Sequence, residues 1–80
     1  MNVKPEDVWA AIDHIADARQ ESLGKLALYA GLDQSTFTYS RRRRNLLSMA
    51  TLLRLLNAYD IDFKDFGVLV DETAKQRKRT

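Results

Sequence analysis

Apolar residues recur at helical spacing through most of the chain, in segments separated by short polar or glycine-containing breaks. The first segment carries apolar residues at i, i+4 and i+7, namely Val8, Ile12 and Ile15. This spacing predicts an amphipathic helix over residues 5–20, which Pro5 can open because the first helical position needs no backbone N–H. We expect Trp9 to pack at the core and His14 to lie at the surface rather than bind a metal.

Two shorter helices are predicted next, with a tight turn between them. Ser22 can cap a helix over residues 23–30, and Gly31 can end it because glycine readily takes the left-handed conformation found at helix C-termini. Asp33 can cap a following helix that starts at Gln34 and ends at residue 41 or 42. A connection this short fixes a steep crossing angle, as in a helix-turn-helix. The apolar residues expected between the two helices are Leu26, Ala27, Ala30, Leu32 and Phe37.

A run of four arginines, Arg41–Arg44, breaks the apolar pattern after these helices. Adjacent guanidinium groups repel one another, so the run resists burial and keeps its charge at a surface. We therefore expect the chain from Arg41 to Leu47 to form a loop.

Two further helices complete the predicted architecture. Ser48 can cap a fourth helix that reaches about residue 59 and has a broad leucine face, and Asp62 can cap a fifth helix. Residues 72–80 carry no apolar periodicity and predict a basic, mobile tail. The whole pattern predicts a single all-α domain over residues 1–71, followed by this tail.

Composition excludes several classes of protein. The chain has 80 residues, enough for one small domain. It has no cysteine and a single histidine, and Gly24-Lys25 lacks the glycine-rich loop of a phosphate-binding motif. We therefore expect no enzyme, no metal and no cofactor. No stretch approaches the roughly 18 apolar residues that span a bilayer, and the N-terminus has no signal-peptide pattern. A cytoplasmic protein without a membrane partner is the expectation.

Charge is distributed unevenly along the chain. The formal net charge is only +2, yet residues 1–24 carry −3 and residues 25–54 carry +5. The positive charge is thus concentrated in the predicted helix pair and in the arginine run after it. Such segregation suits a surface that binds a polyanion.

The predicted helix pair also carries a recognisable order of residues. Leu26-Ala27 is followed by Gly31 four residues after Ala27, then by Leu32, and by Phe37 six residues after the glycine. This order resembles the lambda-repressor and Cro-like helix-turn-helix family. There a small residue lies where the helices cross, glycine forms the turn and an apolar residue anchors the second helix.

The resemblance extends over about residues 5–70 and implies a five-helix, all-α bundle. The segment AGLDQSTF is similar to the DNA-binding domain of repressors that carry a LexA-like peptidase domain, although no peptidase segment is present. One departure is Ser40, which stands where the family usually has an apolar residue near the end of the recognition helix.

The resemblance implies double-stranded DNA as the partner and assigns candidate contacts to it. Gln34 and Ser35 occupy the positions that reach base edges, and the amide of Gln34 can pair bidentately with adenine. Thr38 and Tyr39 lie one turn further along and could touch a thymine methyl group or a phosphate. The candidate backbone contacts are Lys25, Arg41, Arg42, Arg43 and Arg44.

We expect a homodimer, because one short helix reads only a few base pairs and two-fold pairing places two such helices about one helical turn apart. The fifth predicted helix has more apolar residues than one inward face can hold. The candidate dimer interface is Phe63, Phe66, Val68, Leu69 and Val70. The resulting hypothesis is a transcriptional regulator, of the phage or prophage repressor kind, that binds a two-fold operator.

A second hypothesis uses the same helices differently. A protein-interaction adaptor or an antitoxin-like partner would bind another protein through the helix pair and the apolar fifth helix. Helical hairpins with an Ala-x-x-x-Gly-Leu spacing arise by chance, and four arginines alone are typical of a solvated loop. The order of capped helix, glycine turn, polar-faced helix and basic run favours DNA.

Overall fold

The computed structural model describes residues 3–79, and side chains are described for residues 3–77. These residues form five helices and no strand, which confirms the predicted all-α class. The helices are α1 (Pro5–Ala18), α2 (Leu23–Tyr29), α3 (Gln34–Arg43), α4 (Met49–Ala58) and α5 (Phe63–Arg79). Within the described residues, no helix is both long and apolar enough to cross a membrane.

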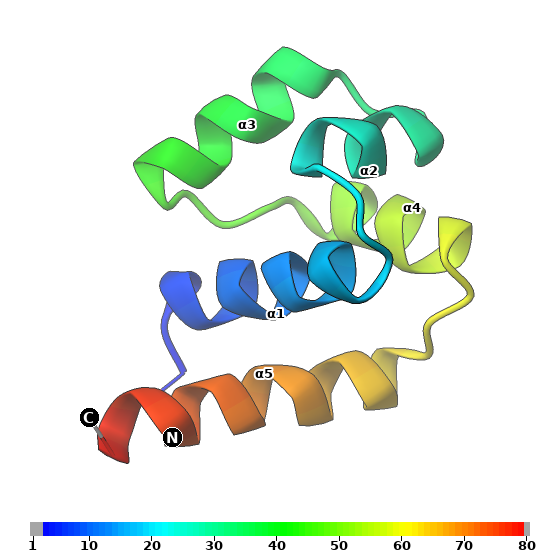
Figure 1. The fold of residues 1–80 in the computed structure, drawn as a ribbon. Coiled ribbons are helices and arrows are strands. Elements are labelled where there is room, and N and C mark those ends of the chain that lie inside the picture. Colours follow the sequence, from blue (N-terminus) through cyan, green and yellow to red (C-terminus); the bar gives the residue numbers. More distant parts are fainter. Residues whose placement is uncertain (1–2, 80) are drawn as a thin grey trace.

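The helices are arranged around α1, which lies in the middle of the molecule (Figure 1). α5 runs antiparallel to α1 along one side and packs against it. α2 contacts α1 and α4, and α3 packs on α2 at the opposite side from α5. The arrangement leaves α3 at the outer edge of the molecule, with its C-terminal end above the first half of α1.

Side-chain caps start the middle helices, as the sequence predicted. The Ser22, Asp33 and Ser48 side chains accept backbone N–H groups at the starts of α2, α3 and α4, at 3.2, 3.0 and 3.1 Å respectively. Gly31 has a φ of 74° and follows the end of α2, which agrees with its predicted turn position. Leu32 N–H then donates to Ala27 O at 2.9 Å and closes the turn.

The core gathers apolar side chains from all five helices. Its fully buried large residues are Ile12, Leu26, Leu55 and Leu56. Trp9 is buried, as predicted, and its indole Nε1–H donates to Asn45 O at 2.9 Å. His14 is exposed, also as predicted. Phe66, Val70 and Ala74 extend the core along α5.

Two predicted helix ends are wrong. α3 continues through Arg43, so Arg41–Arg43 are helical rather than a loop. The basic side chains favour the negative end of the helix dipole, and Arg44 ends the helix in the left-handed conformation, with Asn45 N–H bonded to Ser40 O at 3.0 Å.

The prediction of a mobile tail from residue 72 is also wrong as far as the described residues go. α5 runs on to Arg79, and Thr80 lies outside the described residues. Ala74 is buried, and the Thr73 hydroxyl donates to Asp7 O at 3.0 Å. These contacts with α1 anchor the last turns of α5, whose residues are mostly good helix formers despite their lack of apolar periodicity.

Candidate nucleic-acid interface

α3 is attached to the rest of the molecule by a narrow strip of contacts. Phe37 is its only buried residue, and the ring of Phe37 meets Trp9 edge to face, with centroids 5.1 Å apart. Most other residues of α3 are exposed, and the helix itself lies at the outer edge of the molecule (Figure 1). A helix held in this way presents nearly its whole length to an approaching partner.

Three of the four predicted base-reading residues are exposed on α3, namely Gln34, Ser35 and Tyr39. Thr38 differs from them. It is half-buried, and its hydroxyl donates to the carbonyl oxygens of Gln34 and Ser35 at 3.0 and 3.2 Å. Because that hydroxyl is bonded within its own helix, Thr38 offers its methyl group to a partner more readily than its hydroxyl.

The four arginines, which the sequence grouped together, lie in different environments. Arg41 turns back to α1 and donates to both oxygens of Asp13, at 3.2 and 2.8 Å. Arg44 pairs with Glu6 at 3.6 Å. The Arg43 guanidinium lies over the Tyr39 ring, 5.6 Å from its centroid. Arg42 is exposed and has no ion pair or side-chain hydrogen bond among residues 3–77.

The outward positive charge of α3 is therefore smaller than the run suggests. The bidentate hydrogen bond with Asp13 raises the pKa of Arg41 above its usual value, so the guanidinium stays charged. Both α1 pairs are partly exposed, so each contributes little to stability. They still direct two of the four guanidinium groups toward the protein. Of the five candidate phosphate contacts, Arg42, Arg43 and the exposed Lys25 of α2 have no acidic partner among residues 3–77.

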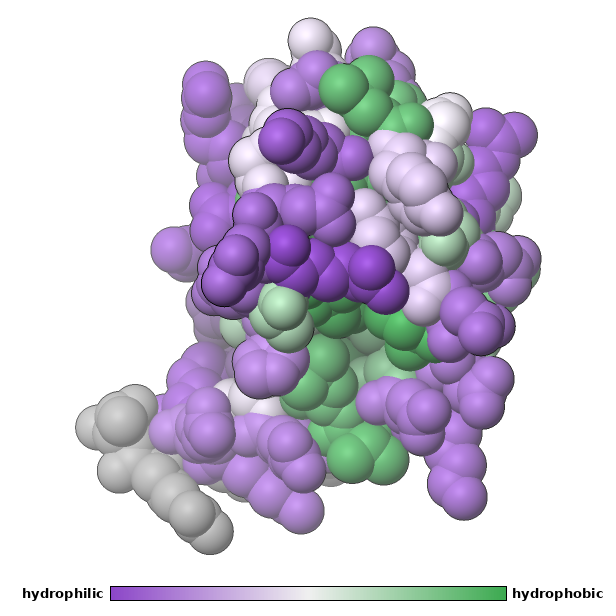
Figure 2. Space-filling view, turned by 45° about the vertical axis from the view of Figure 1, so that its right-hand side comes forward, coloured by the Kyte–Doolittle hydropathy of each residue, from purple (hydrophilic) through white to green (hydrophobic). Residues whose placement is uncertain are grey.

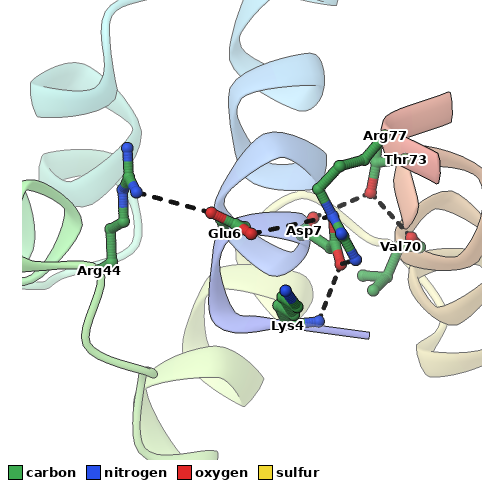
Figure 3. Close-up of polar contacts among 7 residues, drawn as sticks. All are labelled: Lys4, Glu6, Asp7, Arg44, Val70, Thr73 and Arg77. Atoms are coloured by element: carbon green, nitrogen blue, oxygen red, sulfur yellow. Dashed lines mark hydrogen bonds and ion pairs between the residues drawn. The ribbon is translucent and has the colours of Figure 1, made fainter. Parts of the chain in front are cut away.

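An ion pair that the sequence did not predict, between the buried Asp7 and the half-buried Arg77, connects α1 with the end of α5. Arg77 donates to the two carboxylate oxygens of Asp7 at 2.8 and 3.0 Å, and the Lys4 backbone N–H donates to the same carboxylate at 2.8 Å. Glu6 lies between Arg44 and Arg77, so the pair continues toward the end of α3 (Figure 3). The hydrogen bond from Arg77 is the main reason why the pKa of Asp7 is lowered.

The predicted dimer interface needs a correction. Phe66 and Val70 are 4% and 8% exposed and belong to the core, so they cannot contact a partner. Leu69 is half-buried and packs against the same core. Only Phe63 and Val68, each about half exposed, remain accessible on α5. The prediction failed because Phe66, Leu69 and Val70 all pack on the core, so most apolar residues of α5 face inward.

Other apolar residues reach the surface that the sequence did not single out. They are Leu28 and Tyr29 on α2, and Leu46, Met49 and Leu53 on and before α4. Figure 2 shows apolar surface in separate areas of one face, divided by a hydrophilic band. Leu53 belongs to the leucine face predicted for the fourth helix, but it is 40% exposed, whereas Leu55 and Leu56 are buried.

A shallow groove of about 170 Å³ lies between α3 and the start of α4. Ser40 and Phe37 line one side of it, and Leu47 and Thr51 line the other. Ser40, which departs from the family pattern, therefore faces a partly open groove where a hydroxyl group is tolerated. The helix does not end at this residue.

Comparisons of this chain with protein-family models, with curated proteins and with solved structures found no match.

Proposed function

We propose that this chain is a sequence-specific DNA-binding transcriptional regulator that inserts α3 into the major groove. The observation that supports it most is the exposure of α3 along its length, with polar side chains at its N-terminal end and unpaired arginines at its C-terminal end. The major groove of B-form DNA accommodates one α-helix, and its base edges match amide and hydroxyl groups. An exposed polar helix next to free cations has the chemistry for both kinds of contact.

The burial and pairing of side chains sharpen the proposed roles. Gln34, Ser35 and Tyr39 are the base-reading residues, and Thr38 contributes its methyl group. Lys25, Arg42 and Arg43 bind phosphates, because none of them has an acidic partner among the described residues. Arg41 and Arg44 hold α3 against α1 in the free protein.

The test is a selection of bound duplexes from a random pool, followed by titrations of single variants. Gln34→Ala should relax the preference at one base pair by about 1–3 kcal/mol. Arg42→Ala should weaken binding to all sequences alike. It should also reduce the slope of log affinity against log salt concentration by about one, as expected for the loss of one phosphate contact. Arg54→Ala removes an exposed arginine on α4 and serves as the control.

The outcomes separate the proposed roles. Equal effects of Arg42→Ala and Arg54→Ala would contradict the assignment of phosphate contacts to α3. If the unmodified chain shows no preferred duplex in the presence of competitor DNA, sequence-specific binding is refuted.

A protein-interaction adaptor is the second candidate, and it is favoured by the exposed Leu46, Met49 and Leu53. Met49 and Leu53 lie one helical turn apart on α4, and neighbouring exposed apolar side chains are typical of protein-binding sites. This candidate predicts DNA binding that is weak, insensitive to sequence and unchanged by Gln34→Ala. The same titrations therefore discriminate between the two functions.

A further inference from the structure

The side chain of Gln34 lies on the backbone of α2 at Gly24. Gly24 is buried, and a Cβ atom built there would come within 3.0 Å of Gln34 Cδ and 3.3 Å of Cγ, and would overlap Nε2. Gln34 as a whole is exposed, so only one side of its side chain touches α2. The amide of Gln34 thus occupies the space that any side chain at position 24 would need.

The backbone of Gly24 does not require glycine, and the three heavy atoms nearest to a Cβ built there all belong to Gln34. Gly24 is helical, and Gly31 is the only glycine with a positive φ. At Gly31 and Gly67 an added Cβ would meet nothing within 4 Å. Glycine disfavours a helix compared with alanine. Room for Gln34 is the structural feature that accounts for it.

We propose that Gly24 is a positioning residue that sets the orientation of the Gln34 amide and thereby the base pair that Gln34 prefers. This role rests on the proposed DNA-binding function. Bidentate pairing with a base requires the amide plane to be held at one angle. A side chain already held against α2 also loses less conformational freedom on binding than a free one.

Alanine at position 24 tests this role without disturbing the core. The atom that a Cβ would displace is the end of a flexible, exposed side chain, which can move into solvent. We therefore expect Gly24→Ala to fold with an unchanged or higher melting temperature. Gly67→Ala is the matched control, because it makes the same change in a helix where the added methyl group touches nothing.

The experiment compares the unmodified chain, Gly24→Ala, Gly67→Ala, Gln34→Ala and the Gly24→Ala/Gln34→Ala double variant. Each binds the selected duplex and duplexes altered at single base pairs. Gly24→Ala should reduce the preference at the base pair identified by Gln34→Ala by about fivefold or more, with the loss confined to that base pair. Gly67→Ala should keep the preference, and Gly24→Ala should add nothing when Gln34 is already absent.

An NMR measurement on the free protein tests the contact without DNA. Nuclear Overhauser effects between the Gln34 side-chain amide protons and the Gly24 Hα protons are expected, and their loss in Gly24→Ala should accompany a shift of the amide resonances. Absence of these effects in the unmodified chain would overturn the proposal, whatever the chain binds.

The other outcomes are equally decisive. Full retention of the preference in Gly24→Ala, with loss in Gln34→Ala, would refute positioning and leave the proposed function intact. A lower melting temperature of Gly24→Ala would make Gly24 a packing residue and also overturn the proposal. If neither the unmodified chain nor any variant prefers one duplex over another, the proposed function is refuted, and the specificity role of Gly24 is refuted with it.

Discussion

Asp7 has an ionised side chain inside the protein, with only 2% of its surface exposed. Such burial is tolerated because three N–H groups, from Lys4 and Arg77, donate to its two oxygens. The contact with Arg77 holds the pKa of Asp7 below its usual value of 3.8. Asp7 therefore joins the start of α1 to the end of α5 in a charge-dependent way.

Asp7→Asn should lower the free energy of unfolding at pH 7 by about 2 kcal/mol, the typical contribution of hydrogen bonds to a charged group. The folded pKa of Asp7 lies below the unfolded value. Its contribution is therefore complete above the unfolded value and is lost as pH falls through the folded one. The difference between variant and parent should accordingly shrink as the pH falls below about 3.8. Urea denaturation at several pH values measures it.

Asp17→Asn is the control for this experiment, because Asp17 is an exposed carboxylate on the same helix with no ion pair. It should change stability by less than about 0.5 kcal/mol. Equal unfolding free energies for the two variants would show that the Asp7 to Arg77 pair contributes nothing.

At the scale of the elements, the α2–α3 pair depends on the backbone of one residue. Gly31 has a φ of 74°, a conformation that costs an L-residue with a side chain about 1 kcal/mol or more. Gly31→Ala should therefore destabilise the fold by about 1 kcal/mol, although the added methyl group meets no atom. Gly67→Ala should instead stabilise it by up to about 1 kcal/mol, as expected for alanine within a helix.

Chemical denaturation of both alanine variants isolates the backbone effect, because neither substitution creates a contact. If both variants were destabilised equally, the positive φ of Gly31 could not be the cause of the loss of stability.

The starts of the helices could be predicted from the sequence, and some of the ends could not. Ser22, Asp33 and Ser48 carry their capping signal within three residues, because the bond that they make is local. The end of α5 is anchored instead by the contact between Arg77 and Asp7, which are 70 residues apart in the chain. A weaker signal was present, since Phe66, Val70 and Ala74 are spaced i, i+4 and i+8.

The candidate site was predictable to a similar extent. The exposure of Gln34 and Ser35 follows from the period of α3 around Phe37, which the sequence contains. The separate roles of the arginines do not follow, because Arg41 and Arg44 are paired by residues of α1 whose position depends on the whole fold. The contact between Gly24 and Gln34 likewise could not be predicted, because it requires knowing in atomic detail how α2 and α3 cross.

At the scale of the whole molecule, the acidic and basic parts of the chain lie against each other rather than apart. The stretch of α1 from Glu6 to Asp13 faces the end of α3, and these two carboxylates partly neutralise the basic run. If α3 binds DNA as proposed, the surface that it presents to the DNA carries its unpaired positive charge on Lys25, Arg42 and Arg43. Affinity for phosphate should therefore be moderate, and pairing of two copies would be needed for tight binding.

If two copies bind a two-fold site as the proposed function implies, we expect them to meet through the exposed Phe63 and Val68 of α5. We expect Val68→Glu to shift the protein toward the monomer in sedimentation velocity, because a carboxylate would be buried in the contact. Its affinity for a duplex with two half-sites should fall at least about tenfold, corresponding to about 1.4 kcal/mol. Its affinity for a single half-site should be kept.

Leu53→Glu provides the comparison, because Leu53 is also exposed but lies on α4. It should leave self-association unchanged. Loss of association in Leu53→Glu and not in Val68→Glu would place the contact on α4, and a strict monomer on two-site DNA would exclude the dimer altogether.

The contact between Trp9 and Phe37 has an optical consequence. Trp9 is the only tryptophan of the chain, and it is buried between the aromatic anchor of α3 and Asn45 of the following loop. Its emission wavelength and quantum yield therefore report whether α3 is seated on α1. Displacement of α3 would admit water to the indole and move the emission to the red, while the other helices stayed folded. The protein thus carries its own fluorescent reporter for the position of α3.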